Sequence, residues 1–450
     1  MATLARPKGL VLSQSRALRL FTLFILYVGQ GLPLGLFWFA IPAWMAANGA
    51  SVADVGSVLA LTALPWSLKF VNGFFMDRYT FLAMGRRRIW LLGAQGVIIA
   101  ILLLAIVLDP GVKDVAVLGA IGFAVNMATT FQDVAVDGLA VDIMEEEERA
   151  RGSGMMFGGQ SIGIAGATAI TGLVIGTYGA PAAYAIVAIL IAALCVFVLC
   201  FREREGERLL PWTDGVPHAR NLSIQADAWW PVVRNTFVSL TKLPSVLWAP
   251  VLFCRGIFYG GMTGATPLIG SGYLGWDEAK ISTLTAAGGL AAGVLCLTLG
   301  GWLGDRYGAK KTSIGWLAVQ LGMIAIMYAS VDNWSNERLF IAFVYAWISL
   351  DFLLTVACLP ISMRLCDERV AATQFTIYMA IGNFGISFGA FALSKVEKFG
   401  GLQSIFLVVG TGCLAAIVLL VTVRYPRRPE HLARVAAELA NDERLRPKVD

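Results

Sequence analysis

Five ionisable side chains lie inside otherwise apolar runs of the sequence: Lys69, Asp133, Asp137, Arg255 and Asp351. A charge at bilayer depth costs about 2.5–3.5 kcal/mol, so each of these groups must be paired or face water. Asp133 and Asp137 are spaced i,i+4 and share one helix face, where two repelling carboxylates can hold a single proton between them. The approach of a cation, for which Lys69 is the candidate, would release that proton. The alternative is a static ion pair that fixes helix packing.

Other residue types exclude other chemistries. The two histidines, His218 and His431, fall in polar segments, so carboxylates remain as the proton carriers of the apolar runs. Nearly all of the seven cysteines lie in or beside apolar runs without C-x-x-C spacing, and we expect neither disulfides nor a metal site. The motifs G-x-x-x-x-G-K-[ST] and H-E-x-x-H do not occur, which argues against an ATP-driven pump and against an enzyme. The order G-x-S-x-G occurs at residues 159–163 and 385–389, but both copies lie inside apolar runs of membrane-spanning length rather than at a strand-to-helix turn. No cofactor is expected.

The overall composition identifies the solvent of the chain. Of the 450 residues, 57% are hydrophobic and only 14% are charged, whereas soluble domains carry about 25% charged residues. Such a chain cannot cover a water-facing surface, so lipid must be its main solvent. The formal net charge is +5, but the basic residues are dispersed among the polar breaks, and no nucleic-acid partner is expected.

Apolar runs of membrane-spanning length predict the fold class. A helix needs about 20 residues to cross a hydrocarbon core. Twelve runs follow one another, at residues 20–40, 52–75, 89–108, 115–142, 154–176, 181–200, 246–270, 281–303, 312–330, 338–363, 371–393 and 402–423. With both termini inside, the predicted cytoplasmic segments hold 28 of the 35 lysine and arginine residues and the outer segments hold four. The positive-inside rule therefore predicts an all-α protein of twelve transmembrane helices with both termini cytoplasmic.

Helical rise places the charged side chains at similar depths. At about 1.5 Å per residue, Lys69 lies about 12 Å above Asp77 at the inner end of its run, and Asp133 lies about 14 Å into its own run from the same side. Arg255 and Asp351 lie about 15 and 20 Å from the inner ends of theirs. Secondary transporters bind substrate near the midplane, so we expect a central charged cavity.

Glycine and proline interrupt the first apolar run, in Gly29-Gln30-Gly31-Leu32-Pro33. Interrupted helices free backbone groups that can serve a ligand, and Gln30 lies at the depth of the charged residues. Glycine and proline are also common in membrane helices for packing alone. Both interpretations of this segment remain open.

Two sequence markers are repeated along the chain. Gly73-Phe-Phe-Met-Asp77-Arg78 follows the second run, and Gly301-Trp-Leu-Gly-Asp305-Arg306 follows the eighth, 228 residues later. Glu148-Arg149 precedes the fifth run and Glu368-Arg369 precedes the eleventh, 220 residues later. The two offsets agree to within the length of a loop and indicate a duplication into two pseudo-symmetric six-helix bundles. Parallel repeats around a central site are a transporter architecture.

The duplication divides the chain into a cytoplasmic N-terminal tail, a first bundle, a cytoplasmic linker, a second bundle and a cytoplasmic C-terminal tail. These parts are predicted at residues 1–19, 20–200, 201–245, 246–423 and 424–450. Around Trp229 and Trp230 the linker is either a plain connection between the bundles or an amphipathic segment on the membrane surface.

The loop after the eighth run follows the order G-x-L-x-D-R-x-G-x-K/R, with Asp305 and Arg306 at its centre. This order closely resembles the loop signature of the major facilitator superfamily, and the loop with Asp77 and Arg78 is its counterpart in the first half. The glycines allow close helix approach, the aspartate can bridge to a neighbouring helix end, and the basic residues anchor the turn at the headgroups. We interpret both loops as topology anchors, a role compatible with gating.

Five further motifs are distributed over both halves: Leu68-Lys69-Phe70, Met76-Asp-Arg-Tyr-Thr80, Gly85-Arg-Arg-Arg88, Gln132-Asp133-Val-Ala-Val-Asp137 and Ala372-Thr-Gln-Phe375. They resemble the AmpG-type muropeptide permeases, a branch that includes acetyl-CoA transporters. The resemblance implies proton-linked import of anhydro-muropeptides, which are cell-wall fragments released by turnover, across a bacterial inner membrane. It makes the following residues the matching cavity positions: Gly29, Gln30, Lys69, Gln132, Asp133 and Asp137.

The second half departs from this branch at two positions. The seventh run carries Arg255 in an unexpected neighbourhood, and Trp347 stands where an acidic residue is expected, with Asp351 one turn later. Because this half helps to define the ligand, another bulky anionic solute such as a siderophore or acyl-CoA is an alternative substrate. We include Arg255, Trp347 and Asp351 among the substrate-cavity candidates.

The function that we predict from these residues is secondary active transport by alternating access. Asp133 and Asp137 would titrate, Lys69 would neutralise whichever is ionised, and Arg255 would meet a carboxylate or phosphate of the solute. The partners are then the bilayer, a small solute and protons, with no obligate protein partner. An alternative of another class is a membrane sensor or assembly factor without transport, which would require the tail at residues 427–450.

Overall fold

The computed structural model describes residues 10–226, 228–276 and 278–422, and the predicted tail at 424–450 lies outside them. The N-terminal half consists of α1 (Arg16–Leu34), the π-helical η2 (Gly35–Ala40), α2 (Ile41–Ala47), α3 (Val52–Leu68), α4 (Phe70–Arg78), α5 (Arg88–Leu108), α6 (Val115–Ile143), α7 (Arg149–Tyr178) and α8 (Ala180–Leu199). The C-terminal half consists of α11 (Leu243–Leu274), α12 (Glu278–Leu295), the π-helical η5 (Cys296–Gly300), α13 (Gly301–Tyr307), α14 (Ala309–Ala329), α15 (Glu337–Leu365), α16 (Ala371–Gly400) and α17 (Ser404–Thr422). The remaining elements are short: β1 (Leu10–Val11), η1 (Leu12–Gln14), η3 (Leu82–Met84), η4 (Glu146–Glu148), β2 (Phe201–Arg202), α9 (Ala219–Ile224), α10 (Trp229–Thr241), η6 (Val331–Asn333) and η7 (Glu368–Val370).

The predicted all-α membrane fold is confirmed. Within the described residues, eleven helices are long and apolar enough to cross a membrane, and α3 with α4 makes a twelfth span that is bent by 45°. The bend falls at Lys69, between Leu68 and Phe70, one turn after Pro65. Proline cannot donate its backbone hydrogen bond and disturbs the helix around it. The bend therefore lies at the residue that carries the buried charge of this span.

The first span is longer than predicted and is not broken by its glycine and proline residues. The chain is helical from Arg16 to Ala47, with Pro33 inside α1 and the π-helical η2 directly after it. A π-bulge absorbs an irregularity without ending the helix. The predicted interruption is therefore a local widening of a continuous span.

The two halves use the same pattern of helix packing. Among the most extensive contacts of the N-terminal half are those of α1 with α7, α5 with α8 and α3 with α6, and the corresponding pairs α11 with α16, α14 with α17 and α12 with α15 are among the most extensive of the C-terminal half. Glycines bring the first pair of each half together: a Cβ on Gly159 would lie 2.5 Å from the Phe24 carbonyl oxygen, and Gly256 and Gly260 face the backbone of α16. Small residues allow this close approach of membrane helices.

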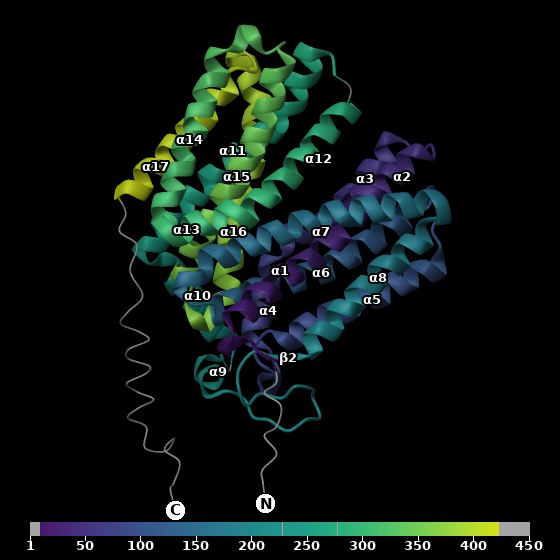
Figure 1. Cartoon of the computed structure of the whole chain (residues 1–450), viewed down its shortest axis with the longest axis vertical. Helices are drawn as coiled ribbons and strands as arrows, with labels where there is room; N and C mark the ends of the chain where they lie inside the picture. The colour runs from purple at the N-terminus through teal and green to yellow at the C-terminus, as the bar shows by residue number, and fades with distance from the viewer. Residues whose placement is uncertain (1–9, 227, 277, 423–450) are drawn as a thin grey trace, which may run out of the picture.

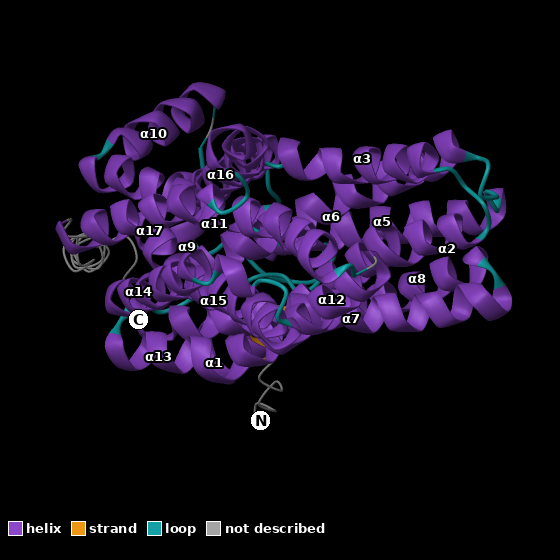
Figure 2. Ribbon diagram, turned by 90° about the horizontal axis from the view of Figure 1, so that it is seen from above, coloured by secondary structure: helices purple, strands orange, loops and turns teal. Residues whose placement is uncertain are grey.

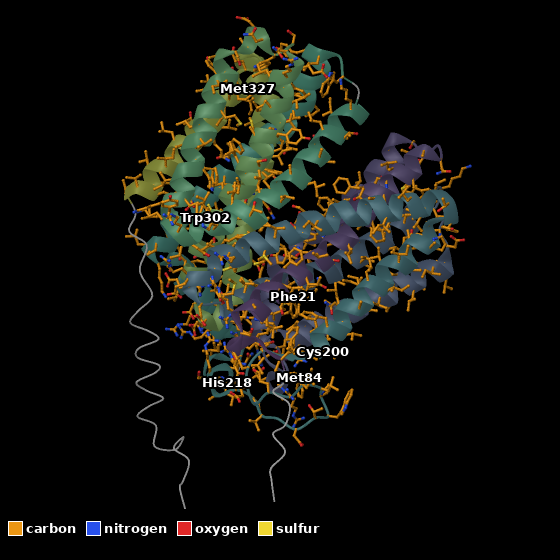
Figure 3. All side chains as sticks on the ribbon, viewed as in Figure 1. Phe21, Met84, Cys200, His218, Trp302 and Met327 are labelled. Atoms are coloured by element: carbon orange, nitrogen blue, oxygen red, sulfur yellow. The ribbon has the colours of Figure 1, made fainter. Side chains whose placement is uncertain are left out.

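The halves contact each other at one end and diverge toward the other (Figure 1). The contacts between halves join α4 and α6 to α16, and α7 to α12, η5, α13 and α15. Figure 3 places Met84, Cys200 and His218 at this contact end and Met327 at the far end of the C-terminal half. The sequence predicts the segments of Met84 and His218 to be cytoplasmic, so the molecule is closed at its predicted cytoplasmic end.

The linker and part of the predicted N-terminal tail are folded against this closed end. Leu10–Val11 and Phe201–Arg202 form a two-stranded parallel sheet, which ties the tail to the start of the linker. Farther along, α10 lies at the outer edge of the bundle beside α16 (Figure 2).

Candidate functional site

The charged residues of the N-terminal half form one buried cluster. Lys69 Nζ lies 2.9 Å from Asp133 Oδ2, and Gln30 Nε2 donates to Asp133 Oδ1 at 2.6 Å. One helical turn farther along α6, Asp137 Oδ1 accepts a 2.5 Å hydrogen bond from the hydroxyl of Tyr27. Relative exposures are 8% for Lys69 and 3% for each aspartate, so the groups are shielded from bulk solvent.

Three helices position this cluster. The bend of the second span turns Lys69 toward α6, while the i,i+4 spacing on α6 places both carboxylates on the face that meets α1. Tyr27 and Gln30, three residues apart on α1, each hold one carboxylate. Among the described residues, no cation lies within 4.0 Å of Asp137, whose partner is a neutral phenol.

Gly29 and Gln132 lie behind the cluster, in the packing between α1, α6 and α8. A Cβ on Gly29 would collide with the side chain of Leu194 and would lie 3.7 Å from Gln132 Nε2. Gln132 Nε2 donates to the Leu26 carbonyl oxygen at 3.2 Å, so both residues contribute to the docking of α1 onto α6. Gln132 Oε1 has no hydrogen-bond partner within the described part of the chain.

The C-terminal half holds a second ion pair. Arg255 donates from Nε to Asp351 Oδ1 at 3.3 Å and from Nη2 to Asp351 Oδ2 at 3.2 Å, a two-pronged contact. Asp351 is buried, and the Arg255 side chain is 17% exposed. Two N–H groups of the planar guanidinium can each donate to one oxygen of a carboxylate, so the geometry of this pair is more sharply defined than that of a lysine–carboxylate pair. In this state Arg255 is therefore hydrogen-bonded to the protein.

An aromatic pair accompanies each ion pair. In the N-terminal half, Trp66 packs edge-on against Trp38 with ring centroids 6.4 Å apart, and Lys69 Nζ lies 5.5 Å from the Trp66 ring centroid. In the C-terminal half, Trp347 packs edge-on against Tyr259 at 5.9 Å. The indole N–H groups of Trp38 and Trp347 are buried and lack a partner among the residues described.

Sequence reasoning missed Tyr27, Trp66 and Tyr259. Tyr27 precedes Gln30 by three residues and Trp66 precedes Lys69 by three, so both lie on the helix faces of residues that were singled out. A search for polar or aromatic neighbours at i−3 would have found Tyr27 and Trp66, and one at i+4 from Arg255 would have found Tyr259.

Asp77 and its surroundings connect the halves at the closed end. Asp77 Oδ2 accepts from the backbone N–H and the hydroxyl of Thr373, at 2.8 and 2.9 Å, while Oδ1 accepts from Arg87 Nη2 at 3.0 Å. Thr373 is the third residue of α16, so Asp77 caps that helix from the other half. Arg87 also reaches Asp142, and Gly73 leaves no room for a side chain against Thr373.

In the second copy of the motif, the aspartate also contacts the opposite half, in a more exposed setting. Asp305 lies beside the start of α7, where Nε of Arg151, the third residue of that helix, lies 3.1 Å from Asp305 Oδ2. The Arg151 side chain is 44% exposed. Within the described residues, the two motif arginines form no ion pair across the halves. Arg78 donates to the Ala226 carbonyl oxygen at 3.4 Å, and Arg306 lies against the rings of its neighbours in α13.

A linker carboxylate holds the loop between α4 and α5. Glu203 accepts three backbone N–H groups, from Arg86 at 2.8 Å and from Arg87 and Arg88 at 2.7 Å each. Burial alone would lower the pKa of Arg87, but the carboxylates of Asp142 and Asp77 raise it above the ordinary value. Burial and the negative charge of Glu203 raise the pKa of Glu207 to about 8.

The sequence model of the Major Facilitator Superfamily matches residues 23–390 and 251–447. The chain belongs to this superfamily. Its members carry small solutes across membranes, and the chain is a multi-pass membrane transporter. The matched family is one of transporters, and the fold agrees with it.

Relatives and solved structures agree with this assignment. "Putative transporter AmpG 4" of Rickettsia felis is 25% identical over 89% of this chain and 95% of its own length. "Anhydromuropeptide permease" of Escherichia coli K12 is 25% identical over 90% of this chain and 80% of its own length. The predicted resemblance to AmpG-type permeases is thereby confirmed over most of the chain.

Solved structures share the fold at low sequence identity. The human organic anion transporter MFSD10 (TETRAN) superposes with a TM-score of 0.66 at 12% identity, covering 90% of this chain and 100% of the other. A bacterial homologue of the iron transporter ferroportin in its outward-facing state gives 0.65 at 14% identity, covering 90% and 98%.

Proposed function

We propose that the protein is a proton-coupled importer of anhydro-muropeptides in a bacterial inner membrane and that it works by alternating access. The observation that carries the proposal is the buried cluster of Lys69, Asp133 and Asp137 in a chain similar to an anhydromuropeptide permease over 90% of its length. The arrangement closed at the predicted cytoplasmic end corresponds to a state that receives solute from outside.

The charges in the cluster support a role in proton coupling. One ammonium group faces two carboxylates, and an unbalanced buried charge is costly. A proton on Asp137, next to the phenol of Tyr27, balances the cluster while Asp133 remains the partner of Lys69. If solute entry draws Lys69 away from Asp133, that carboxylate becomes the costly charge and takes up a proton. Proton binding and solute binding are then linked through Lys69.

The two aromatic pairs and Arg255 support the proposed class of solute. An anhydro-muropeptide joins sugar rings to a peptide with free carboxylates, and it therefore presents flat apolar faces, hydroxyl groups and negative charge. The pair of Trp38 and Trp66 beside Lys69 and the pair of Tyr259 and Trp347 in the C-terminal half provide ring faces and indole donors. Arg255 would exchange Asp351 for a solute carboxylate. A siderophore or acyl-CoA would use the same features, so the experiment must compare the solutes.

The test is uptake into proteoliposomes that contain the purified protein under an imposed pH gradient, inside alkaline. Labelled anhydro-muropeptide, a ferric siderophore and acetyl-CoA are supplied in parallel. We expect muropeptide uptake that is abolished by dissipating the gradient, and we expect Asp133→Asn and Asp137→Asn each to lose at least 90% of it. Asp332→Asn, which changes an exposed carboxylate, is the matched control and should transport normally.

Two results would overturn the proposal separately. Equal uptake with and without the gradient, or full uptake by both cluster variants, would refute proton coupling through these residues. Uptake of acetyl-CoA or siderophore without muropeptide would refute the substrate while leaving the coupling intact.

A further inference from the structure

Helix α10 in the linker has two different long faces. Its inner face is made of Val232, Thr236 and Ser239, which are buried against the bundle. Its outer face follows the helical spacing i, i+3, i+7 and carries Trp230, Val233 and Phe237, with relative exposures of 71%, 43% and 68%. The outer face is therefore largely apolar, and it stays exposed in the part of the chain that the structure describes.

The position of α10 places this outer face at the membrane boundary. Trp229, its first residue, packs edge-on against Phe75 and Tyr79, with ring centroids 5.4 and 5.5 Å apart. Phe75 is in the last turn of α4 and Tyr79 directly follows it, so α10 lies at the depth where this spanning segment ends. Phe75 and Tyr79 are themselves 41% and 46% exposed, and α10 lies at the outer edge of the bundle (Figure 2). Tryptophan and amphipathic helices concentrate at this depth in membranes.

The inner face of α10 touches both halves of the molecule. Trp229 packs on α4, and Val232 joins Phe74 of α4 and Val370 of η7 in one small apolar cluster. Ser239 Oγ lies 3.5 Å from Asp367 Oδ2, again in the C-terminal half. The capping contact between Asp77 and Thr373 lies close by, because it joins α4 to the start of α16, which directly follows η7. Separation of the halves at this end requires α10 to release one of its two partners.

We propose that α10 is an interfacial helix that inserts Trp230, Val233 and Phe237 into the cytoplasmic leaflet and, from there, straps α4 to η7 so that lipid stabilises the closed cytoplasmic end. The occupant of the outer face is lipid because the face adjoins the spanning surface of α4 at the level of the headgroups. Arg234, exposed on the same face, can meet lipid phosphates. This proposal does not depend on the identity of the solute, and its tests use none.

The first test measures the surroundings of Trp230 in the full-length protein. The protein is reconstituted in phosphatidylcholine vesicles with and without lipids brominated near the headgroup end of the acyl chain. The fluorescence emission of Trp230 is obtained by subtracting the emission of the Trp230→Phe variant from that of the wild-type protein. Trp212, which is 80% exposed in the linker outside α10, gives the control difference through Trp212→Phe.

We expect brominated lipid to quench the Trp230 emission by more than half, while iodide in the aqueous phase leaves it unchanged. The Trp212 emission should show the reverse pattern. If iodide quenches Trp230 as strongly as Trp212, or if bromine does not quench it, the outer face is not in lipid and the proposal fails. A protein partner on this face would give that result. Both substitutions are conservative, so neither threatens folding.

The second test addresses the strap. Nitroxides on Phe81 and Tyr307, exposed residues at the closed end of the two halves, report the separation of the halves by pulsed electron resonance in a Cys200→Ser background. Trp230→Glu with Phe237→Glu should reduce the closed population at least threefold relative to the parent, whereas Trp212→Glu should not change it. An unchanged distribution in the double variant would leave α10 in lipid but refute the strap.

Discussion

Asp77 offers the sharpest quantitative test of how the closed end is held. Its carboxylate makes two charge-assisted hydrogen bonds across the halves, both to Thr373, and one within its own half, to Arg87. Asp77→Asn keeps the volume and removes the charge. The amide has a single acceptor oxygen, so it cannot accept from Thr373 and from Arg87 in the way that the carboxylate does.

The size of the effect follows from the bonds that are lost between the halves. Hydrogen bonds to a charged group contribute about 1.5–3 kcal/mol each, and neutral bonds about 0.5–1.5. If the amide oxygen still faces Thr373, two bonds lose about 1 kcal/mol each, or about 2 kcal/mol in total. The bond to Arg87 does not count, because both partners move with the same half. The ratio of closed to open cytoplasmic ends should therefore fall by about thirtyfold.

The assay is the same pair of nitroxides on Phe81 and Tyr307. The variant should transfer most of the short-distance population to a longer distance, and Thr373→Val, which deletes only the hydroxyl bond, should give a smaller shift. Asp305→Asn is the matched control in the second repeat. Its partner Arg151 is 44% exposed, so we expect a change of about 1 kcal/mol or less, about fivefold. Equal shifts for Asp77→Asn and Asp305→Asn, or no shift for Asp77→Asn, would refute the assignment of the stabilisation to a buried cap.

Three further results are expected. Gly163→Ala should lower the melting temperature in detergent, because its Cβ would collide with the backbone of α1, whereas Gly166→Ala on the same helix points into open space and should not. Glu207→Gln should flatten the pH dependence of the free energy of unfolding. With a folded pKa of about 8, native Glu207 keeps a proton that the unfolded state releases above about pH 4.5, so the wild-type free energy of unfolding should fall by about 1 kcal/mol per pH unit from pH 6 to 8. A variant with the same slope as the wild type would contradict this. Arg255→Lys keeps the charge but should lower solute uptake at least tenfold, because an ammonium group cannot make the two-pronged contact that the Arg255 guanidinium makes with Asp351. Normal uptake by this variant would count against a role for the planar guanidinium.

The architecture was predictable from the sequence because the membrane imposes simple rules. Twelve apolar runs and the distribution of lysine and arginine predicted the spans, and the duplicated Asp77 and Asp305 motifs predicted two matching halves. The ends of the spans were less accurate: the first span extends from Arg16 to Ala47 rather than over residues 20–40, because the helix continues through Pro33 and a π-helical segment. The apolar side chains of a run show which residues contact lipid, but they do not show at which residue the backbone hydrogen bonds of the helix end.

The partners of the candidate residues were only partly predictable. Helical spacing placed Asp133 and Asp137 on one face and Lys69 at their depth, so the approach of Lys69 could be anticipated. The bond from Tyr27 to Asp137 and the pairing of Arg255 with Asp351 could not, because they depend on how α1 rotates against α6 and α11 against α15. The roles of these residues in coupling and solute binding stay predictions.

The sequence by itself determined the membrane-protein class of this chain, the number of its spans and its duplication, because these follow from apolarity and from repeated motifs; the depth of its buried charges stays a prediction. Only the tertiary structure decided that Asp77 caps α16 from the opposite half and that the linker forms a helix against both halves. Asp77 and Thr373 are 296 residues apart in the chain, and no local pattern encodes their distance. It arises from the packing of two bundles, in which a glycine at position 73 lets the helices approach closely enough for the carboxylate to reach.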